Sequence, residues 1–350
     1  MNTLPLLSWI VWNPSRVAFT VPFLEHPVVW YGVLFAMGFL ASYMLGVHIF
    51  LFEVFSKTPV EEKMLVDQNR LIQLCRQHPK LFDQNQLSIE NILPLLHKYI
   101  KAKILPLKFF HHTILNTRKL AMGIIDQLTT YLVIGILVGA RLGYVFFYGW
   151  PSFKANPMEI FKIWEGGLAS HGASFGILLG LTFFIIRRSK EKLKFSFLHV
   201  LDVIAIFTGV IAFFIRIGNF VNQEIVGIPT TVPWAIIFAQ PFGGEAAVPR
   251  HPVQLYEAFF YLLLAIFTYM LWKKNKVKMG EGVMSGVLIT LLFAFRFFIE
   301  FFKEHQGLVI QPQNALQMGQ ILSVPFVVLG LMLVLRPIWQ SKRLYKKSQL

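Results

Sequence analysis

The sequence predicts an all-α polytopic membrane protein with about seven transmembrane helices, its N-terminus outside and its C-terminus in the cytoplasm. Of its 350 residues, 55% are hydrophobic and only 15% are charged. Because an ordinary soluble protein carries about 25% charged residues, a large soluble enzyme is excluded. The 35 Phe residues exclude a disordered chain. The distribution of the basic residues then gives the orientation.

Seven apolar stretches are long enough to cross a bilayer, which takes about 20 helical residues. They cover residues 30–52, 124–148, 167–186, 200–222, 254–272, 282–302 and 318–335. The first stretch is too long, and begins too far from Met1, for a plain cleaved signal sequence. We therefore expect all seven stretches to be retained as membrane helices.

The net charge of +15 is also compatible with nucleic-acid binding, so the position of the basic residues decides between the two readings. Of the 33 Lys and Arg residues, 25 lie in segments that fall on one side of the membrane: 53–123, 187–199, 273–281 and 336–350. Cytoplasmic loops carry the excess of Lys and Arg. The charge is therefore a topology signal, and no nucleic-acid partner is expected.

The apolar stretches and the basic segments together predict four parts of the chain. We expect an N-terminal segment with the first helix at 1–52, a basic cytoplasmic insertion at 53–123, a six-helix membrane core at 124–335 and a basic cytoplasmic tail at 336–350. Residues 92–120 alternate apolar patches with Lys, which suits a helix lying on the anionic inner leaflet and equally a solvated helical insert.

Neither cysteine nor histidine chemistry is indicated in the insertion. Cys75 is the single cysteine, so an internal disulfide is excluded and a spectator thiol is expected. His97, His111 and His112 have no acidic or thiol partner at ligand spacing. We expect no metal and no other cofactor.

Three basic residues lie inside the apolar spans: Arg141, Arg216 and Arg296. Each costs about 2.5–3.5 kcal/mol at the bilayer centre on insertion scales. At 1.5 Å per residue, all three lie roughly 23–26 Å from the inner face, in the outer half of the bilayer. Glu300 follows Arg296 by four residues and is expected to pair with it. The remaining positive charge indicates an anion site, and lipid phosphate is the abundant anion at that depth.

The richest polar stretch follows Arg216 and includes Asn219, Asn222 and Glu224. An ordinary capped helix end is one interpretation, but a buried Arg and Asn one turn apart favour a site. His171 is expected at the depth of the arginines, and its alternative role is structural. The repeat Gly172, Gly176 and Gly180 predicts close packing against another helix.

Six motifs in order now carry a family resemblance. They are Trp-Tyr-Gly at 30–32, Gly-Ala-Arg-Leu-Gly-Tyr at 139–144, Glu-Gly-Gly with His-Gly at 165–172, Arg-Ile-Gly-Asn-Phe and its sequel at 216–227, Arg-His-Pro with Gln-Leu-Tyr-Glu at 250–257, and Phe-Arg with Glu-Phe-Phe at 295–302. Over about 240 residues, at 26–50 and 121–335, the chain resembles bacterial prolipoprotein diacylglyceryl transferases.

The resemblance implies transfer of the diacylglyceryl group of phosphatidylglycerol to the lipobox cysteine thiol in the signal peptide of a preprolipoprotein. A thioether and glycerol phosphate would be the products, and a multi-pass protein of the bacterial inner membrane, with 124–335 as its catalytic core, is implied. The implied catalytic residues are Arg216, Arg296, His171, Tyr31 and Glu224. The implied lipid-binding residues are Arg141, Arg216, Asn219, Gly227, Arg296 and Glu300.

The chain departs from the family pattern at Ile215, Gln223, Val226 and Leu292 and in its long 53–123 insertion. These departures bear on substrate preference, since the charged set is intact. The competing hypothesis is a transporter for an anion or lipid, with the arginines as selectivity elements. That class predicts polar residues along the inner halves of the spans, which are nearly all apolar apart from Asp126 and Asp202.

Overall fold

The structure is a computed structural model, and it confirms a predominantly helical membrane protein. It describes residues 9–22, 26–57, 117–147, 149–162, 167, 169–190, 194–304 and 317–347, with short pieces at 72–73, 75–85, 87–88, 91–92, 94–95 and 98–99. Its long helices are α1 (Trp30–Lys57), α6 (Thr117–Phe147), α8 (Ser170–Arg188), α9 (Phe197–Asn222), α10 (Val253–Lys273), α11 (Val283–Ile299) and α12 (Met318–Lys347). Shorter elements are α7 (Trp150–Ala155) and the 3-10 turns η1 (Pro157–Phe161) and η3 (Glu300–Phe302).

Six helices among the described residues are long and apolar enough to cross a membrane: α1, α6, α9, α10, α11 and α12. The predicted third span is present as α8, a helix of 19 residues that is not among these six. The count of seven spans and the orientation therefore stay predictions.

Three helices extend well beyond the apolar stretches that predicted them. Helix α1 ends at Lys57 and α6 begins at Thr117, both inside the predicted insertion, and α12 continues to Lys347, inside the predicted tail. Apolar length marks the part of a helix that fits in the hydrocarbon, and a helix continues beyond it while its backbone hydrogen bonds persist. His97, His111 and His112, and most of the stretch 92–120, lie outside the described residues.

The chain divides into two compact units. The first unit is Met1–Leu45 with Leu198–Leu350, and the second unit is Gly46–Phe197. The predicted four-part division at 52, 123 and 335 is not tested by this grouping and stays a prediction.

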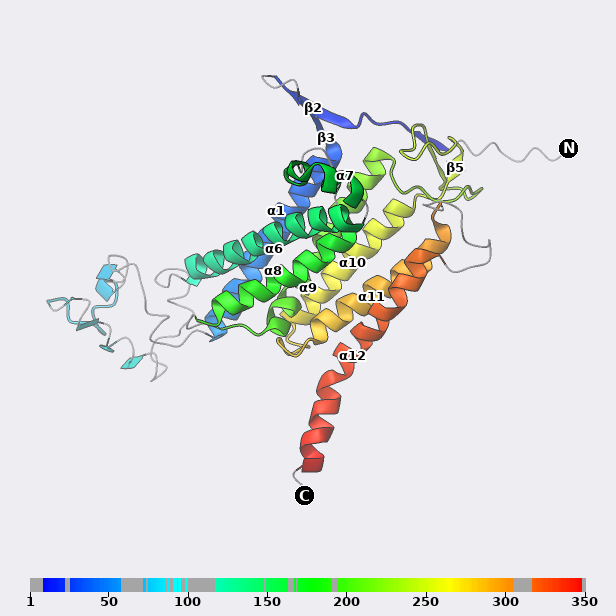
Figure 1. The fold of residues 1–350 in the computed structure, drawn as a ribbon. Helices are drawn as coiled ribbons and strands as arrows, with labels where there is room; N and C mark the ends of the chain where they lie inside the picture. The colour runs from blue at the N-terminus through cyan, green and yellow to red at the C-terminus, as the bar shows by residue number, and fades with distance from the viewer. Residues whose placement is uncertain are drawn as a thin grey trace. The chain divides into compact units, whose positions relative to one another are not determined.

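In the second unit, α6 and α8 lie side by side (Figure 1), and glycines bring their backbones into direct contact. A Cβ placed on Gly176 would lie 1.9 Å from the carbonyl oxygen of Gly135, and one on Gly172 would lie 2.1 Å from that of Gly139. No side chain fits at these positions. The close packing predicted from the Gly172, Gly176 and Gly180 repeat is confirmed, and α6 is the partner.

In the first unit, α9, α10 and α11 run side by side (Figure 1), and α11 packs along α12. Small residues set the helix spacing: a Cβ on Gly209 of α9 would lie 2.7 Å from the carbonyl oxygen of Tyr261 on α10. At the other end of α9, the fully buried Asp202 carboxylate accepts hydrogen bonds from the backbone N–H of Gly282 and Ser285 at 2.9 Å. Asp202 thereby caps the start of α11.

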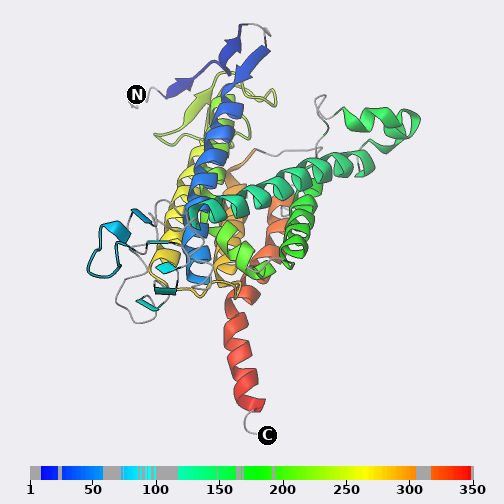
Figure 2. The same ribbon diagram turned by 90° about the vertical axis from the view of Figure 1, so that its left-hand side faces the viewer.

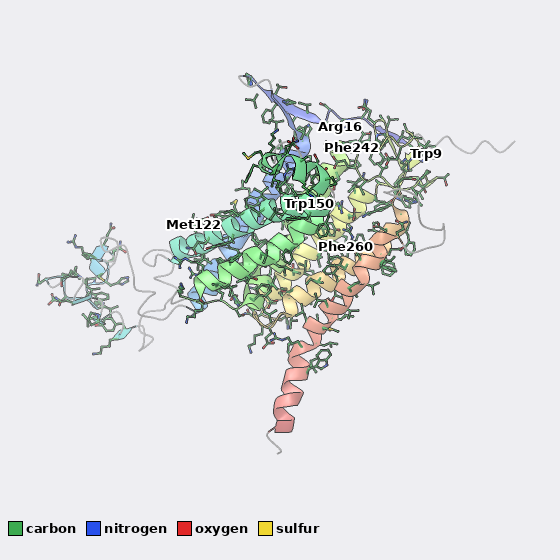
Figure 3. The ribbon with its side chains drawn as sticks, viewed as in Figure 1. Trp9, Arg16, Met122, Trp150, Phe242 and Phe260 are labelled. Carbon is green, nitrogen blue, oxygen red and sulfur yellow. The ribbon has the colours of Figure 1, made fainter. Side chains whose placement is uncertain are left out.

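The sequence predicts helices alone, whereas the described residues of the first unit also form five short strands. Strand β1 (Ile10–Trp12) pairs in parallel with β4 (Ile236–Phe238), which pairs with β5 (Pro249–Arg250), while β2 (Val17–Val21) and β3 (His26–Val29) form a hairpin. Figure 2 shows the strands at the end of this unit opposite to the C-terminal end of α12.

Strand β1 lies over the C-terminal end of α9. The Trp12 ring stacks on Phe220 with centroids 4.5 Å apart, and its indole N–H donates to the carbonyl oxygen of Phe220 at 3.0 Å. Strand β1 therefore supports the end of α9, from which the polar stretch continues.

Candidate active site

A buried cluster of charged side chains joins the end of α9 to the start of α10 and to the segment after α11. Arg216 on α9 places its Nε 3.0 Å from Oε2 of Glu257 on α10. Lys303, directly after η3, donates from its Nζ to the other oxygen, Oε1, at 2.9 Å. Glu257 is fully buried, so this carboxylate is shared between two cations away from bulk water.

A chain of hydrogen bonds continues from Arg216 to the carboxylate of Glu224. Nη1 of Arg216 donates to Oδ1 of Asn219 at 3.0 Å, and Nδ2 of Asn219 donates to Oε2 of Glu224 at 2.7 Å. Asn222 donates to Oε1 of Glu224 at 3.0 Å. Both oxygens of Glu224 therefore accept from amide groups, and the Asn219 amide is fixed with its oxygen toward Arg216.

The chain reverses after α9 and so brings Glu224 back over the last helical turn. Gln223 and Ile225 have φ angles of 58° and 55°, in the left-handed region. The backbone N–H of Glu224 donates to the carbonyl oxygen of Asn219 at 2.8 Å, and Gln254 of α10 donates to the carbonyl oxygen of Glu224 at 2.7 Å. The departure at Gln223 therefore falls on a turn residue.

Gly227 lies where three segments meet. A Cβ there would lie 2.3 Å from the carbonyl oxygen of His251 and 2.9 Å from that of Phe302. Gly227 also forms an isolated β-bridge with Lys303. Because no side chain fits at position 227, glycine is required for the close approach that joins the Glu224 loop to the segment carrying Lys303. A lipid-binding role for Gly227 stays a prediction.

Arg296 and Glu300 do not form the ion pair that their spacing predicted. Helix α11 ends at Ile299, and Glu300 begins the 3-10 turn η3. In a 3-10 turn, side chains three residues apart are aligned, and Oε2 of Glu300 accordingly lies 3.6 Å from Nζ of Lys303. Within the described part of the chain, the side chain of the half-buried Arg296 forms neither a hydrogen bond nor an ion pair.

Two tyrosines of the first unit, Tyr31 and Tyr261, lie near the charged side chains of the cluster. The Tyr31 ring of α1 lies against Gly218, where a Cβ would come 2.8 Å from the ring, and it interacts electrostatically with Glu224 and Arg216. Tyr261 of α10 interacts electrostatically with Arg216 and Arg296. The first unit thus brings together seven of the predicted site residues: Tyr31, Arg216, Asn219, Glu224, Gly227, Arg296 and Glu300.

The other two predicted residues, Arg141 and His171, belong to the second unit. Nε of Arg141 donates to the carbonyl oxygen of Ile160 at 2.8 Å, its Nη groups donate to those of Glu159 and Gly167, and its guanidinium lies over the Phe153 ring. Arg141 therefore ties the loop after α6 to its own helix. His171 lies in the first turn of α8, and its side chain lies outside the described part, as do Glu165 and Gly166.

Sequence reasoning missed Glu257 and Lys303 as site residues. Glu257 belongs to the stretch 249–257, which carries an unusual number of ionisable residues for an interfacial anchor. Lys303 is one of the few basic residues outside the four segments rich in Lys and Arg, and nothing in its local sequence marks it as a site residue. The two residues are 46 positions apart in the sequence, so only the fold reveals the pair.

A second polar group lies beside the cluster. The hydroxyl of Tyr256 accepts from the indole N–H of Trp234 at 2.7 Å and lies 3.2 Å from Nδ1 of His251. Burial lowers the pKa of His251, so its imidazole is neutral at pH 7. Arg250 donates to the carbonyl oxygen of Gly227 at 3.0 Å and pairs with Glu304.

No group of three or more His, Cys, Asp or Glu among the described residues is placed to hold a metal ion. The absence of a metal and of other cofactors stays a prediction.

Comparison with known proteins gives one consistent result. The sequence pattern of the prolipoprotein diacylglyceryl transferase family matches residues 102–336. A protein of Protochlamydia amoebophila named phosphatidylglycerol–prolipoprotein diacylglyceryl transferase is 40% identical over 96% of this chain and 97% of its own length. Proteins of the same name from Chlamydia caviae and Porphyromonas gingivalis are 35% and 34% identical, each over 96% of both chains.

Proposed function

The chain belongs to the prolipoprotein diacylglyceryl transferase family, and from this premise we propose its substrates, its reaction and the residues that perform it. It transfers the diacylglyceryl group of phosphatidylglycerol to the lipobox cysteine of a preprolipoprotein signal peptide. The relatives' names pair phosphatidylglycerol with a prolipoprotein. The six membrane-length apolar helices of the described part suit an enzyme of the bacterial inner membrane whose lipid substrate lies in the same bilayer.

The observation that carries the residue assignment is the contrast between the two arginines of the first unit. Arg216 already uses Nε on Glu257 and Nη1 on Asn219. An arginine has five N–H donors, and none of those on Arg296 is used by the described residues. Arg296 is therefore the open anion receptor, and Arg216 is a second cation held beside it.

The reaction needs an activated thiol and a stabilised leaving group. The lipobox thiol, with an ordinary pKa of about 8.5, is only a few per cent ionised at pH 7, and nearby cations favour its thiolate. The thiolate sulfur attacks the glyceryl carbon, a C–S bond forms and the C–O bond to phosphate breaks. The electron pair leaves with the phosphate oxygen, whose growing charge a guanidinium fork stabilises.

The thiol proton must be accepted by a base, and Glu224 is the candidate that we assign. Its carboxylate is held by Asn219 and Asn222 and is connected through Asn219 to Arg216. His171 is the other candidate. A Glu224→Gln variant with a normal lipid KM and a strongly reduced kcat supports Glu224, whereas the same signature in His171→Asn with an active Glu224→Gln assigns the base to His171.

No observation favours the transporter hypothesis. Asp202, the buried acidic residue at the far end of α9, is fully occupied in capping α11, with four hydrogen bonds from Gly280, Gly282 and Ser285. It is therefore not an open polar group along a path through the first unit.

The proposed function is tested with the purified protein, phosphatidylglycerol labelled in its glycerol headgroup and a lipobox peptide. We expect labelled glycerol phosphate and lipidated peptide in equal amounts. A peptide with Ser in place of the lipobox Cys should yield neither product. Glycerol phosphate released equally with the Ser peptide would identify a phospholipase, and a lack of lipidated peptide would refute the transfer.

A further inference from the structure

We propose that Lys303 is a positioning residue, which holds one oxygen of Glu257 so that Arg216 keeps its positive charge for the phosphate of the substrate lipid. This inference rests on the proposed function, since the anion in question is that of phosphatidylglycerol. Lys303 acts through Glu257 and does not itself need to touch the lipid.

The geometry of the three charges supports this role. Oε1 of Glu257 accepts from Lys303 at 2.9 Å, while Oε2 lies 3.0 Å from Nε of Arg216. The Glu257 side chain is 0% exposed, and those of Lys303 and Arg216 are 8% and 13% exposed. With so little water available, each charge depends on the others for compensation.

The charge balance explains why a second cation is present. In an isolated pair with Glu257, Arg216 would be the only cation that compensates this carboxylate. Lys303 supplies a second cation to Glu257, so Arg216 does not carry that compensation alone. Without Lys303, both carboxylate oxygens are available to Arg216, and a bidentate fork is the preferred geometry for an arginine and a carboxylate. That fork would draw the guanidinium away from Asn219, which now accepts from Nη1.

Lys303 is held in place by its backbone, which fits a positioning role. The segment after α11 pairs with the Gly227 loop on both sides of Lys303: Ile228 donates to the carbonyl oxygen of Phe302 at 2.9 Å, and Glu304 donates to that of Val226 at 3.1 Å. The Nζ group is further directed by Glu300 at 3.6 Å. The Lys303 ammonium lies next to the carboxylates of Glu257 and Glu300. Its positive charge therefore compensates protein carboxylates and not the lipid phosphate.

The first test compares substitutions of Lys303 in the full chain. Lys303→Met should raise the KM for phosphatidylglycerol roughly 10- to 100-fold, as expected for the loss of a charge-assisted contact at Arg216. Lys303→Arg should stay within about threefold of wild type, because it keeps the charge on Glu257. Lys303→Gln, which keeps a donor without the charge, should fold and resemble Lys303→Met.

The matched control is Lys278→Met. Lys278 also pairs with a glutamate three residues away, Glu281, at 2.8 Å, but its side chain is 81% exposed. Exposed pairs of this kind contribute little, so the control should keep the wild-type KM. A loss equal to that of Lys303→Met would show that any lysine removal weakens the enzyme and would overturn the proposal.

The decisive test is rescue by a second substitution. If Lys303 acts by occupying Glu257, then Glu257→Gln in the Lys303→Met background removes the uncompensated carboxylate and releases Arg216. The double variant should recover most of the KM lost by Lys303→Met. A double variant as poor as the single one would overturn the proposal, because direct lipid contact or a purely structural role of Lys303 predicts no recovery.

A binding measurement separates this inference from the proposed reaction. Stabilisation of the protein by phosphatidylglycerol, read as a rise in Tm in detergent, requires no turnover. The rise should be lost in Lys303→Met and regained in the double variant. A wild-type protein that shows these shifts and transfers nothing would refute the reaction and leave the positioning role standing, while unchanged shifts in all variants would refute the positioning role.

Discussion

Replacing Arg296 by lysine should remove activity without removing stability, and this combination is the sharpest prediction of the site. The substitution keeps the charge and loses the planar fork that binds two phosphate oxygens. A transition-state contact of this kind is worth about 2.7–4 kcal/mol, or roughly 100- to 1000-fold in kcat. Since the Arg296 side chain has no hydrogen bond or ion pair within the described residues, the free energy of unfolding should change by less than about 0.5 kcal/mol.

Arg216→Lys should behave differently because Arg216 supports the fold as well as the site. It would lose the contacts of Nε with Glu257 and of Nη1 with Asn219. A hydrogen bond to a charged group contributes about 1.5–3 kcal/mol. Arg216→Lys should therefore lower both kcat and Tm, whereas Arg296→Lys lowers kcat alone.

The assay is the initial rate of peptide lipidation, with thermal unfolding measured on the same detergent-solubilised samples. Arg336→Lys on α12 is the control, since its guanidinium donates to the carbonyl oxygen of Glu281 at the opposite end of the unit. The control should retain the wild-type rate. An Arg296→Lys enzyme at near wild-type rate, or one with a clearly lowered Tm, would show that Arg296 is a packing element and refute the reasoning.

Three further predictions follow from single features. Gly227→Ala should cost about 1–3 kcal/mol of stability, because its Cβ would lie 2.3 Å from the carbonyl oxygen of His251; an unchanged Tm would contradict this packing. Cys75→Ser should leave the rate unchanged, because burial raises the pKa of the Cys75 thiol to about 11 and the attacking thiol comes from the peptide; a folded but inactive variant would indicate an enzyme-bound intermediate. In a background without Cys75, a cysteine at Pro151 should react with an impermeant thiol reagent from outside and one at Lys80 should not, and the reverse pattern would overturn the orientation.

The parts of the fold that could be predicted from sequence are those set by one helix at a time. The lengths of the apolar stretches predicted the long helices, and the glycine repeat at 172, 176 and 180 predicted that α8 packs closely against another helix. Arg216 and Asn219, one turn apart, were expected to act together, and their side chains are hydrogen-bonded. The three-residue strand β1 was missed because so short a segment carries no alternation of apolar and polar residues.

The parts that could not be predicted depend on contacts between distant segments. Glu257 and Lys303 are 46 residues apart, and the local sequence around neither residue predicts that the two side chains pair. The spacing of Arg296 and Glu300 predicted an ion pair, but the change from α-helix to 3-10 turn at Glu300 directs its carboxylate toward Lys303. That local change reverses the expected roles of the two arginines: Arg216 is the paired residue, and Arg296 is the open one.

The most direct test of the central claim is a cryo-EM structure of the protein in nanodiscs that contain phosphatidylglycerol. The account predicts lipid phosphate oxygens about 2.7–2.9 Å from the guanidinium of Arg296, with Arg216 still beside Glu257 and Lys303. A phosphate bound elsewhere, with the Arg296 guanidinium paired to a protein carboxylate, would contradict it.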